Sequence, residues 1–215
     1  SQGLLAATKG FAEFQEGILK IGSQIAGFTA GRAFEEMGAQ VHALAVRFGR
    51  ETSDISKALF ELQGTFGDTA KAMIVLEASG QLAVGGFTNI FDASQAISSV
   101  LKGLKLEVGE SAKVANALKI GSDQGRASVG EFAKSISGMT PTLSAFRVDL
   151  REANAALAVL TNQGYTTSEA VTALSRILFA IGAPTVRAKK YMEELAIQMG
   201  VAKIDFVRTK EGVVD

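Results

Sequence analysis

Few residues in this sequence are of the types that perform catalysis or hold a metal ion. The chain has 215 residues, no Cys and a single His. It therefore offers no thiolate nucleophile, no disulfide and no Cys-based zinc site. His42 stands alone in an apolar stretch, where a histidine is more often a partly buried packing residue than a ligand or a base.

Two other patterns could be drawn as catalytic sites. Ser99 and Lys102 have the Ser-x-x-Lys spacing of a serine nucleophile, but no other motif of that machinery accompanies them. Paired carboxylates could act as acid and base in glycan cleavage, although neighbouring charges on amphipathic helices normally form a solvated face. These carboxylates are Glu35, Glu36, Glu193 and Glu194.

Phosphate-binding glycine loops are missing too, since the sequence has neither Gly-x-x-x-x-Gly-Lys-Ser/Thr nor Gly-x-Gly-x-x-Gly. We therefore assign no catalytic, cofactor-binding or metal-binding residue. We expect a chain that is not an enzyme and uses no cofactor.

Composition and charge limit the partners. The 22 Lys and Arg residues balance 22 Asp and Glu residues, so bulk charge favours neither nucleic acid nor anionic lipid. The 47% hydrophobic content is typical of a chain that forms a core. No transmembrane segment is predicted, because apolar stretches are broken well before the roughly 20 residues that a spanning helix needs. The first residues lack a Met and a signal peptide, which predicts a chain cut from something longer.

Apolar residues recur at spacings of three and four, the period of a helix face buried in a core. With 23 Gly and only 2 Pro, these stripes favour helices punctuated by glycine over short strands. We predict an all-α fold of stacked helical hairpins, with about ten helices and no significant sheet. The predicted helices cover residues 2–21, 24–48, 53–65, 69–84, 88–106, 110–121, 128–140, 149–163, 167–182 and 185–199.

Helix-capping pairs precede the later apolar stripes. A reciprocal cap can form at a helix N-terminus when Ser, Thr or Asp is followed three residues later by Glu. The pairs are Ser128 with Glu131, Asp149 with Glu152, and Thr166 with Glu169. The clearest stripes are Ile90, Ala93, Ile97, Leu101 and Leu104; Val129, Phe132, Ala133, Ile136 and Met139; and Ala170, Ala173, Leu174, Ile177, Leu178 and Ile181.

A faint internal repeat supports the hairpins. Ala58, Leu59 and Leu62 are followed by Ala72 and Leu76, and the same offsets recur in two further places. These are Ala156, Leu157, Leu160, Ala170 and Leu174, and Leu101, Leu104, Val114 and Leu118. The repeat predicts a helix end, a turn and a second helix that packs back on the first, unless it arises by chance from the abundance of Ala and Leu.

Residues 1–48 differ in texture from the rest, because glycines interrupt a stripe of Phe and Ile. Gly27 and Gly31 have the small-residue spacing that lets helices approach closely. We expect this segment either to pack in an oligomer or against the rest of the chain, or to be active at a membrane. We divide the chain into this Gly-rich helical segment at 1–48, a helical-hairpin domain at 49–200, and an irregular tail at 201–215 that continues into missing chain.

A series of segments in a fixed order carries a family resemblance. It begins with Glu51–Leu59 and Leu76–Ala83 and continues through Ala93–Leu101, Glu110–Leu118, Gly130–Ile136, Ala156–Gly164 and Ser168–Ala170. Over about residues 47–183 this series resembles the conserved helical region of phage tail tape measure proteins, also called phage-related minor tail proteins.

The resemblance implies a structural virion protein that sets tail length, templates assembly of the tail tube and takes part in genome delivery. The implied partners are further copies of itself, tail tube proteins, tail tip or baseplate proteins, tail assembly chaperones and the host membrane on ejection, without sequence-specific nucleic acid binding. The implied location is the lumen or tip of the virion tail, and the host cytoplasm during assembly.

Length argues that this chain is a compact part of such a protein. At about 1.5 Å per residue, a fully helical chain of this size would reach roughly 320 Å, and hairpins reach far less. The chain is therefore expected to be a fragment and not itself the ruler. The alternative is a membrane-active helical domain that inserts into or permeabilises the host envelope.

Overall fold

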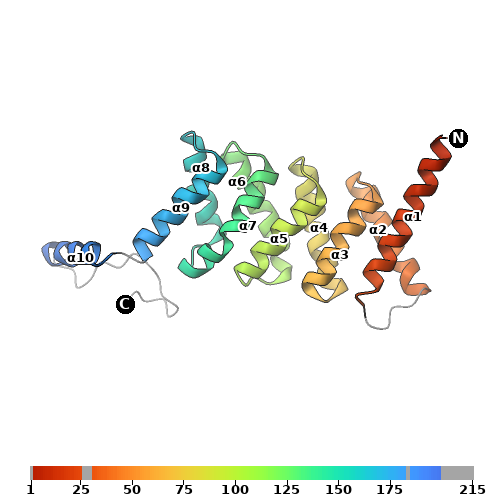
Figure 1. The fold of residues 1–215 in the computed structure, drawn as a ribbon, viewed down its shortest axis with the longest axis horizontal. Helices are drawn as coiled ribbons and strands as arrows, with labels where there is room; N and C mark the ends of the chain where they lie inside the picture. Colours follow the sequence, from red (N-terminus) through yellow and green to blue (C-terminus); the bar gives the residue numbers. More distant parts are fainter. Residues whose placement is uncertain (1, 26–30, 183–184, 200–215) are drawn as a thin grey trace.

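The chain forms a row of helices in a computed structural model that describes residues 2–25, 31–182 and 185–199 (Figure 1). No strand occurs in these ranges, so the predicted all-α class is confirmed. The elements are α1 (Gln2–Gly22), α2 (Arg32–Phe48), α3 (Thr52–Phe66), α4 (Thr69–Gly85), α5 (Ile90–Gly103), the 3₁₀ turn η1 (Val108–Glu110), α6 (Ser111–Gln124), α7 (Val129–Phe146), α8 (Leu150–Asn162), α9 (Thr167–Gly182) and α10 (Val186–Met199).

The helices stack in two layers, as the predicted hairpins require. Helices α1, α3, α5, α7 and α9 pack in sequence against one another in one layer, and α2, α4, α6 and α8 form the other. From α2 to α9 the chain crosses from one layer to the other at each linker, so the linkers that follow α3, α5 and α7 share one edge of the row (Figure 1). Each helix therefore rests mainly on near neighbours, as in helical repeat proteins.

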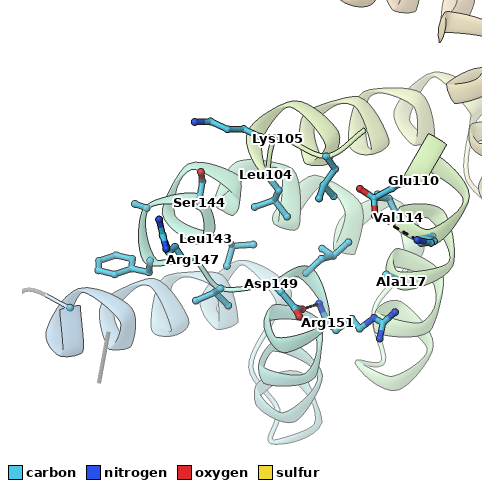
Figure 2. Close-up of a pocket in the computed structure, with 17 residues that line it drawn as sticks. Leu104, Lys105, Glu110, Val114, Ala117, Leu143, Ser144, Arg147, Asp149 and Arg151 are labelled. Atoms are coloured by element: carbon cyan, nitrogen blue, oxygen red, sulfur yellow. Dashed lines mark hydrogen bonds and ion pairs between the residues drawn. The ribbon is translucent and has the colours of Figure 1, made fainter. Parts of the chain in front are cut away.

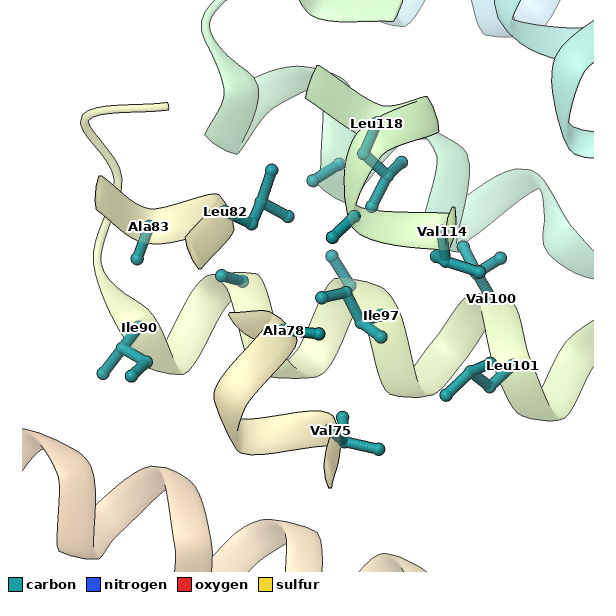
Figure 3. Packing of buried hydrophobic residues seen from close by; sticks show 14 of the residues in the cluster. Val75, Ala78, Leu82, Ala83, Ile90, Ile97, Val100, Leu101, Val114 and Leu118 are labelled. Atoms are coloured by element: carbon teal, nitrogen blue, oxygen red, sulfur yellow. The ribbon is translucent and has the colours of Figure 1, made fainter. Parts of the chain in front are cut away.

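The core lies between the layers. Figure 3 shows α4, α5 and α6 meeting around Leu82, Ile97 and Leu118, which are at most 3% exposed. Burying each such side chain contributes about 1.5–3 kcal/mol. Burial also confirms the predicted stripes of α5 and α7, except that Leu104 is only partly buried.

Polar contacts join helices that are next but one in the sequence. Asn154 on α8 donates its side-chain N–H to the carbonyl of Ala117 on α6 at 2.7 Å. Arg50 donates to the carbonyls of Ala83 and Thr88 at 3.1 and 2.9 Å, which ties the α2–α3 linker to the end of α4. Of these acceptors, the carbonyl of Ala83 lies in the last turn of α4, where a helix leaves carbonyls without an intrahelical partner.

One linker geometry recurs from α2 to α9, except between α3 and α4. In each of these linkers, the preceding helix is followed by a residue with a left-handed backbone conformation. The next residue donates its backbone N–H to the carbonyl five residues earlier, and the residue after that immediately precedes the next helix. This is the Schellman arrangement, which usually places glycine at the left-handed position. The left-handed residues are Gly49, Phe87, Lys105, Arg126, Arg147 and Gly164.

The predicted caps are present. Ser128 with Glu131 and Asp149 with Glu152 form reciprocal capping boxes at α7 and α8. Thr166 accepts from the Glu169 N–H at 3.3 Å and donates to the Glu169 carboxylate at 2.8 Å ahead of α9. Each such cap contributes about 1 kcal/mol.

The predicted repeat corresponds to the hairpins α3–α4, α5–α6 and α8–α9. The third hairpin starts in the other layer from the first two. The sequence pattern did not distinguish the layers, because most turns in both use the same linker geometry.

Some boundaries differ from the prediction. The helix expected to end at residue 140 continues through Pro141 to Phe146, because Leu143 is buried in the core and its packing outweighs the hydrogen bond that proline removes. The helix expected from residue 24 begins at Arg32, and residues 26–30 lie outside the described ranges. The predicted tail at 201–215 also lies outside them.

Candidate functional site

A hollow opens where the α5–α6 and α7–α8 linkers meet, and we call it the α5–α8 groove. It has a volume of about 990 Å³ and is lined by residues of α6, α7 and α8, the two linkers and Gly182. Its apolar lining includes Leu104, Leu106, Val114 and Leu143. The hollow lies beside the end of α7, and α8, which forms part of its wall, packs on α6 and α9.

Basic side chains surround this groove. Figure 2 shows Lys105, Arg147 and Arg151 around the hollow, with Leu104 and Leu143 between them. All three basic residues are exposed, and none of them forms an ion pair with another described residue. They are therefore available to an external group.

The acidic residues of the groove are already engaged. Glu110 forms an ion pair with Lys113 at 3.7 Å. The Asp149 carboxylate accepts the backbone N–H groups of Arg151 and Glu152 at 2.5 and 3.0 Å, which caps α8. The groove thus presents an excess of positive charge over an apolar floor.

Two of the basic residues adopt left-handed backbone conformations. Lys105 has φ of 56° and Arg147 has φ of 53°, in linkers on the same edge of the row. A side chain in this region costs about 1–2 kcal/mol relative to the usual helical region, a cost that glycine avoids. Sequence patterns did not predict the groove, although each of these residues lies two positions before the acidic residue that starts the next element.

A second feature is the apolar surface of α9. Only Ala170 and Leu174 of this helix are buried, whereas Ile177, Phe179 and Ile181 are exposed. The predicted stripe of α9 is therefore wrong for Ile177 and Ile181, because no described helix covers this end of the row. Phe179 instead stacks edge-on against Phe146 of α7, with ring centroids 5.1 Å apart.

The Ser-x-x-Lys pair lies on α5 and is used for packing. Lys102 donates to the carbonyl of Thr65 and lies over the ring of Phe66, 5.3 Å from its centroid. Ser99 is half-buried. The lysine therefore joins α5 to the end of α3.

The other candidate residues lie far apart. Glu36 pairs with Arg32 at 2.8 Å on α2, while the Glu193–Glu194 pair is on α10, toward the opposite end of the molecule (Figure 1). His42 is exposed on α2, so the expected partial burial is wrong; the stripe that faces the core passes through Val41 and Ala45 instead.

The described ranges contain no cluster of three or more His, Asp or Glu residues that could hold a metal ion. No single helix there has the length and hydropathy to cross a membrane, whereas α9 and Val186–Gln198 reach that limit only when taken together as a bent pair.

The sequence matches a known family. The profile of the phage-related minor tail protein family matches residues 36–213, which is most of the chain. The chain therefore belongs to the phage-related minor tail protein family, a family of structural proteins of the virion tail.

A similar protein with a printed description indicates which kind of tail protein the chain resembles. The chain is 28% identical over 157 residues to a protein of Clostridium phage phiCD119 described as a "probable tape measure protein". The match covers 71% of this chain and 16% of the relative, so the chain spans about a sixth of that protein's length. No solved structure matches the chain.

Proposed function

We propose that the chain is a folded segment of a tape measure protein, with a structural and non-enzymatic role in the phage tail. The observation that carries this proposal is the similarity to a probable tape measure protein of which this chain spans only 16%. Hairpins stacked in two layers are much shorter than the same residues in one helix. The segment would therefore be a compact body within a longer ruler.

In this role the parent protein sets tail length, templates assembly of the tail tube and takes part in genome delivery. Its partners would be copies of itself, tail tube proteins, tail tip or baseplate proteins and assembly chaperones. Exposed Ile177 and Ile181, which lie one turn apart on α9, support such association, because exposed apolar side chains that share a face can mark interaction sites. The protein would occupy the lumen or tip of the tail, after a stage in the host cytoplasm.

Purified particles provide the test. The intact mass of the gene product that contains these residues should be measured from tails and compared with tail length. We expect a product several times longer than this chain, whose remaining residues at about 1.5 Å each approach the length of the tail. A product absent from tails would contradict the proposal.

The alternative role concerns residues 1–48, which we propose as a separate Gly-rich segment ahead of the hairpins at 49–200. Helices α1 and α2 contact α3, and Ile18, Ile21 and Val41 are buried. A membrane-active role would require these side chains to leave the core. The full chain should then release dye from liposomes of bacterial lipid, and an absence of leakage would contradict the alternative.

A further inference from the structure

We propose that the α5–α8 groove binds an acidic, partly apolar peptide segment of a partner protein. In this complex, the segment's carboxylates pair with Lys105, Arg147 and Arg151, and its apolar side chains lie on Leu104 and Leu143. This inference rests on the geometry of the groove and does not depend on the proposed function.

Charge complementarity identifies the occupant. The chain as a whole has a net charge of +0, so the excess of positive charge at the groove is a local feature. The acidic residues of the lining are held by Lys113 and by the N-terminus of α8. Lys105, Arg147 and Arg151 have no such partner among the described residues, and carboxylates are the groups that a guanidinium pairs with best in a protein segment.

The backbone gives a second, independent argument. Lys105 and Arg147 occupy left-handed positions in two separate linkers, where glycine would be free of strain. Both linkers nevertheless place a long basic side chain beside the same hollow (Figure 2). Phe87 and Arg126 share this conformation but do not line the groove, so the support for binding comes from the meeting of two such basic residues at one hollow.

The shape of the groove favours a peptide over other ligands. Its volume of about 990 Å³ is at the upper end of the range for small-molecule sites. The charges are exposed at the rim, on flexible side chains, and do not converge on one buried point. The apolar part of the lining is aliphatic apart from Phe146, its one aromatic residue, whereas proteins that bind single-stranded nucleic acid stack bases on several aromatic rings.

The test uses the full chain and a fluorescein-labelled peptide in which Asp and Glu alternate with Leu and Ala. We expect saturable binding by fluorescence anisotropy, weakened by added salt because exposed charges are screened. In NMR spectra, the amides of Ala117 and Ser144, which line the groove, should shift on titration.

The decisive variant is Lys105→Gly with Arg147→Gly. Both changes relieve backbone strain, so the fold should be retained while two rim charges are removed. We expect peptide affinity to fall about tenfold. Arg126→Gly is the matched control, because Arg126 is also left-handed (φ 51°) but belongs to a linker on the opposite edge of the row.

Several results would overturn the proposal. These are no binding of the acidic peptide, equal binding of a peptide with Gln and Asn in place of Glu and Asp, or unchanged affinity of the double-glycine variant. Tighter binding of oligo(dT) than of the acidic peptide would also overturn it and would assign the groove to nucleic acid.

Discussion

Helices α7 and α9 lie side by side in the same layer, yet only α7 has its apolar face covered. Both begin with a predicted cap, at Ser128 and Thr166, and both carry an apolar stripe. On α7 the stripe from Val129 to Leu143 is buried between α5 and α9. On α9 burial ends at Leu174, because α7 and α8 are its only extensive contacts among the described residues.

An amphipathic pattern therefore specifies which face of a helix is apolar, but not whether another helix covers that face. The free energy gained from a stripe depends on the area removed from water, which is set by the neighbouring helices. In a stacked array, a terminal helix keeps the pattern and loses part of the burial. Variants on the two helices can therefore measure how much the neighbouring helices contribute to the free energy of unfolding.

The largest difference is expected between Ile136→Ala on α7 and Ile177→Ala on α9. Ile136 is fully buried and Ile177 is 47% exposed. The first variant should lose about 2–5 kcal/mol of unfolding free energy and the second less than about 1 kcal/mol. Urea denaturation measures both losses. Because both variants replace Ile by Ala within a helix, the change in helix propensity is the same in the two and does not affect the comparison. Equal losses would break the comparison and show that Ile177 is covered in solution.

A glycine comparison sharpens the role of close packing. In Gly121→Ala, the new Cβ would overlap the ring of Phe132, which is fully buried on α7. Overpacking of this kind costs about 1–3 kcal/mol, less the gain of up to about 1 kcal/mol from replacing a helical glycine.

Two controls accompany this variant. Gly138→Ala should be neutral or stabilising, because nothing lies within 4 Å of the new Cβ. Gly182→Ala on α9 meets Phe146, a half-buried ring that can move, so its loss should be smaller than that of Gly121→Ala. Thermal melts followed by circular dichroism give the ranking, and a larger loss at Gly182 would contradict it.

The smallest effect is expected at the start of α9. The backbone N–H and the hydroxyl of Thr166 donate to the Glu169 carboxylate and lower its pKa below its usual range. Because the pKa is lower in the folded chain, this cap stabilises α9 above the unfolded pKa. The contribution is lost as the pH falls through the folded pKa.

Amide hydrogen exchange around Thr166 measures this cap. Exchange should accelerate as the pH falls through the carboxylate range, after correction for the intrinsic rate. Glu169→Gln should remove that dependence, while Glu61→Gln, at an exposed position within α3, should keep it. A dependence that survives in Glu169→Gln would assign the effect to another group.

Much of the fold could be predicted from the sequence. The spacing of apolar residues located the helices, because the backbone imposes the period of a helix face and this period is visible over a few turns. The caps at Ser128, Asp149 and Thr166 were predictable for the same local reason, since each uses residues three positions apart. Pro141 misled the prediction, because only the packing of α7 shows that the helix continues.

The groove could not be predicted. Lys105, Arg147 and Arg151 come from separate segments, and no pattern of spacing connects them. Left-handed residues other than glycine give no local signal, since most side chains avoid that region and the turn overrides the preference. Only the stacking of α6, α7 and α8 brings these residues to one hollow.

Residues close together in the chain specify the helices, their caps and their apolar faces, and an ordered series of segments carries the family. The two layers, the exposed face of α9 and the charged rim of the α5–α8 groove arise only in the folded chain. These depend on contacts between helices far apart in the sequence, and their energies are set by which surfaces meet.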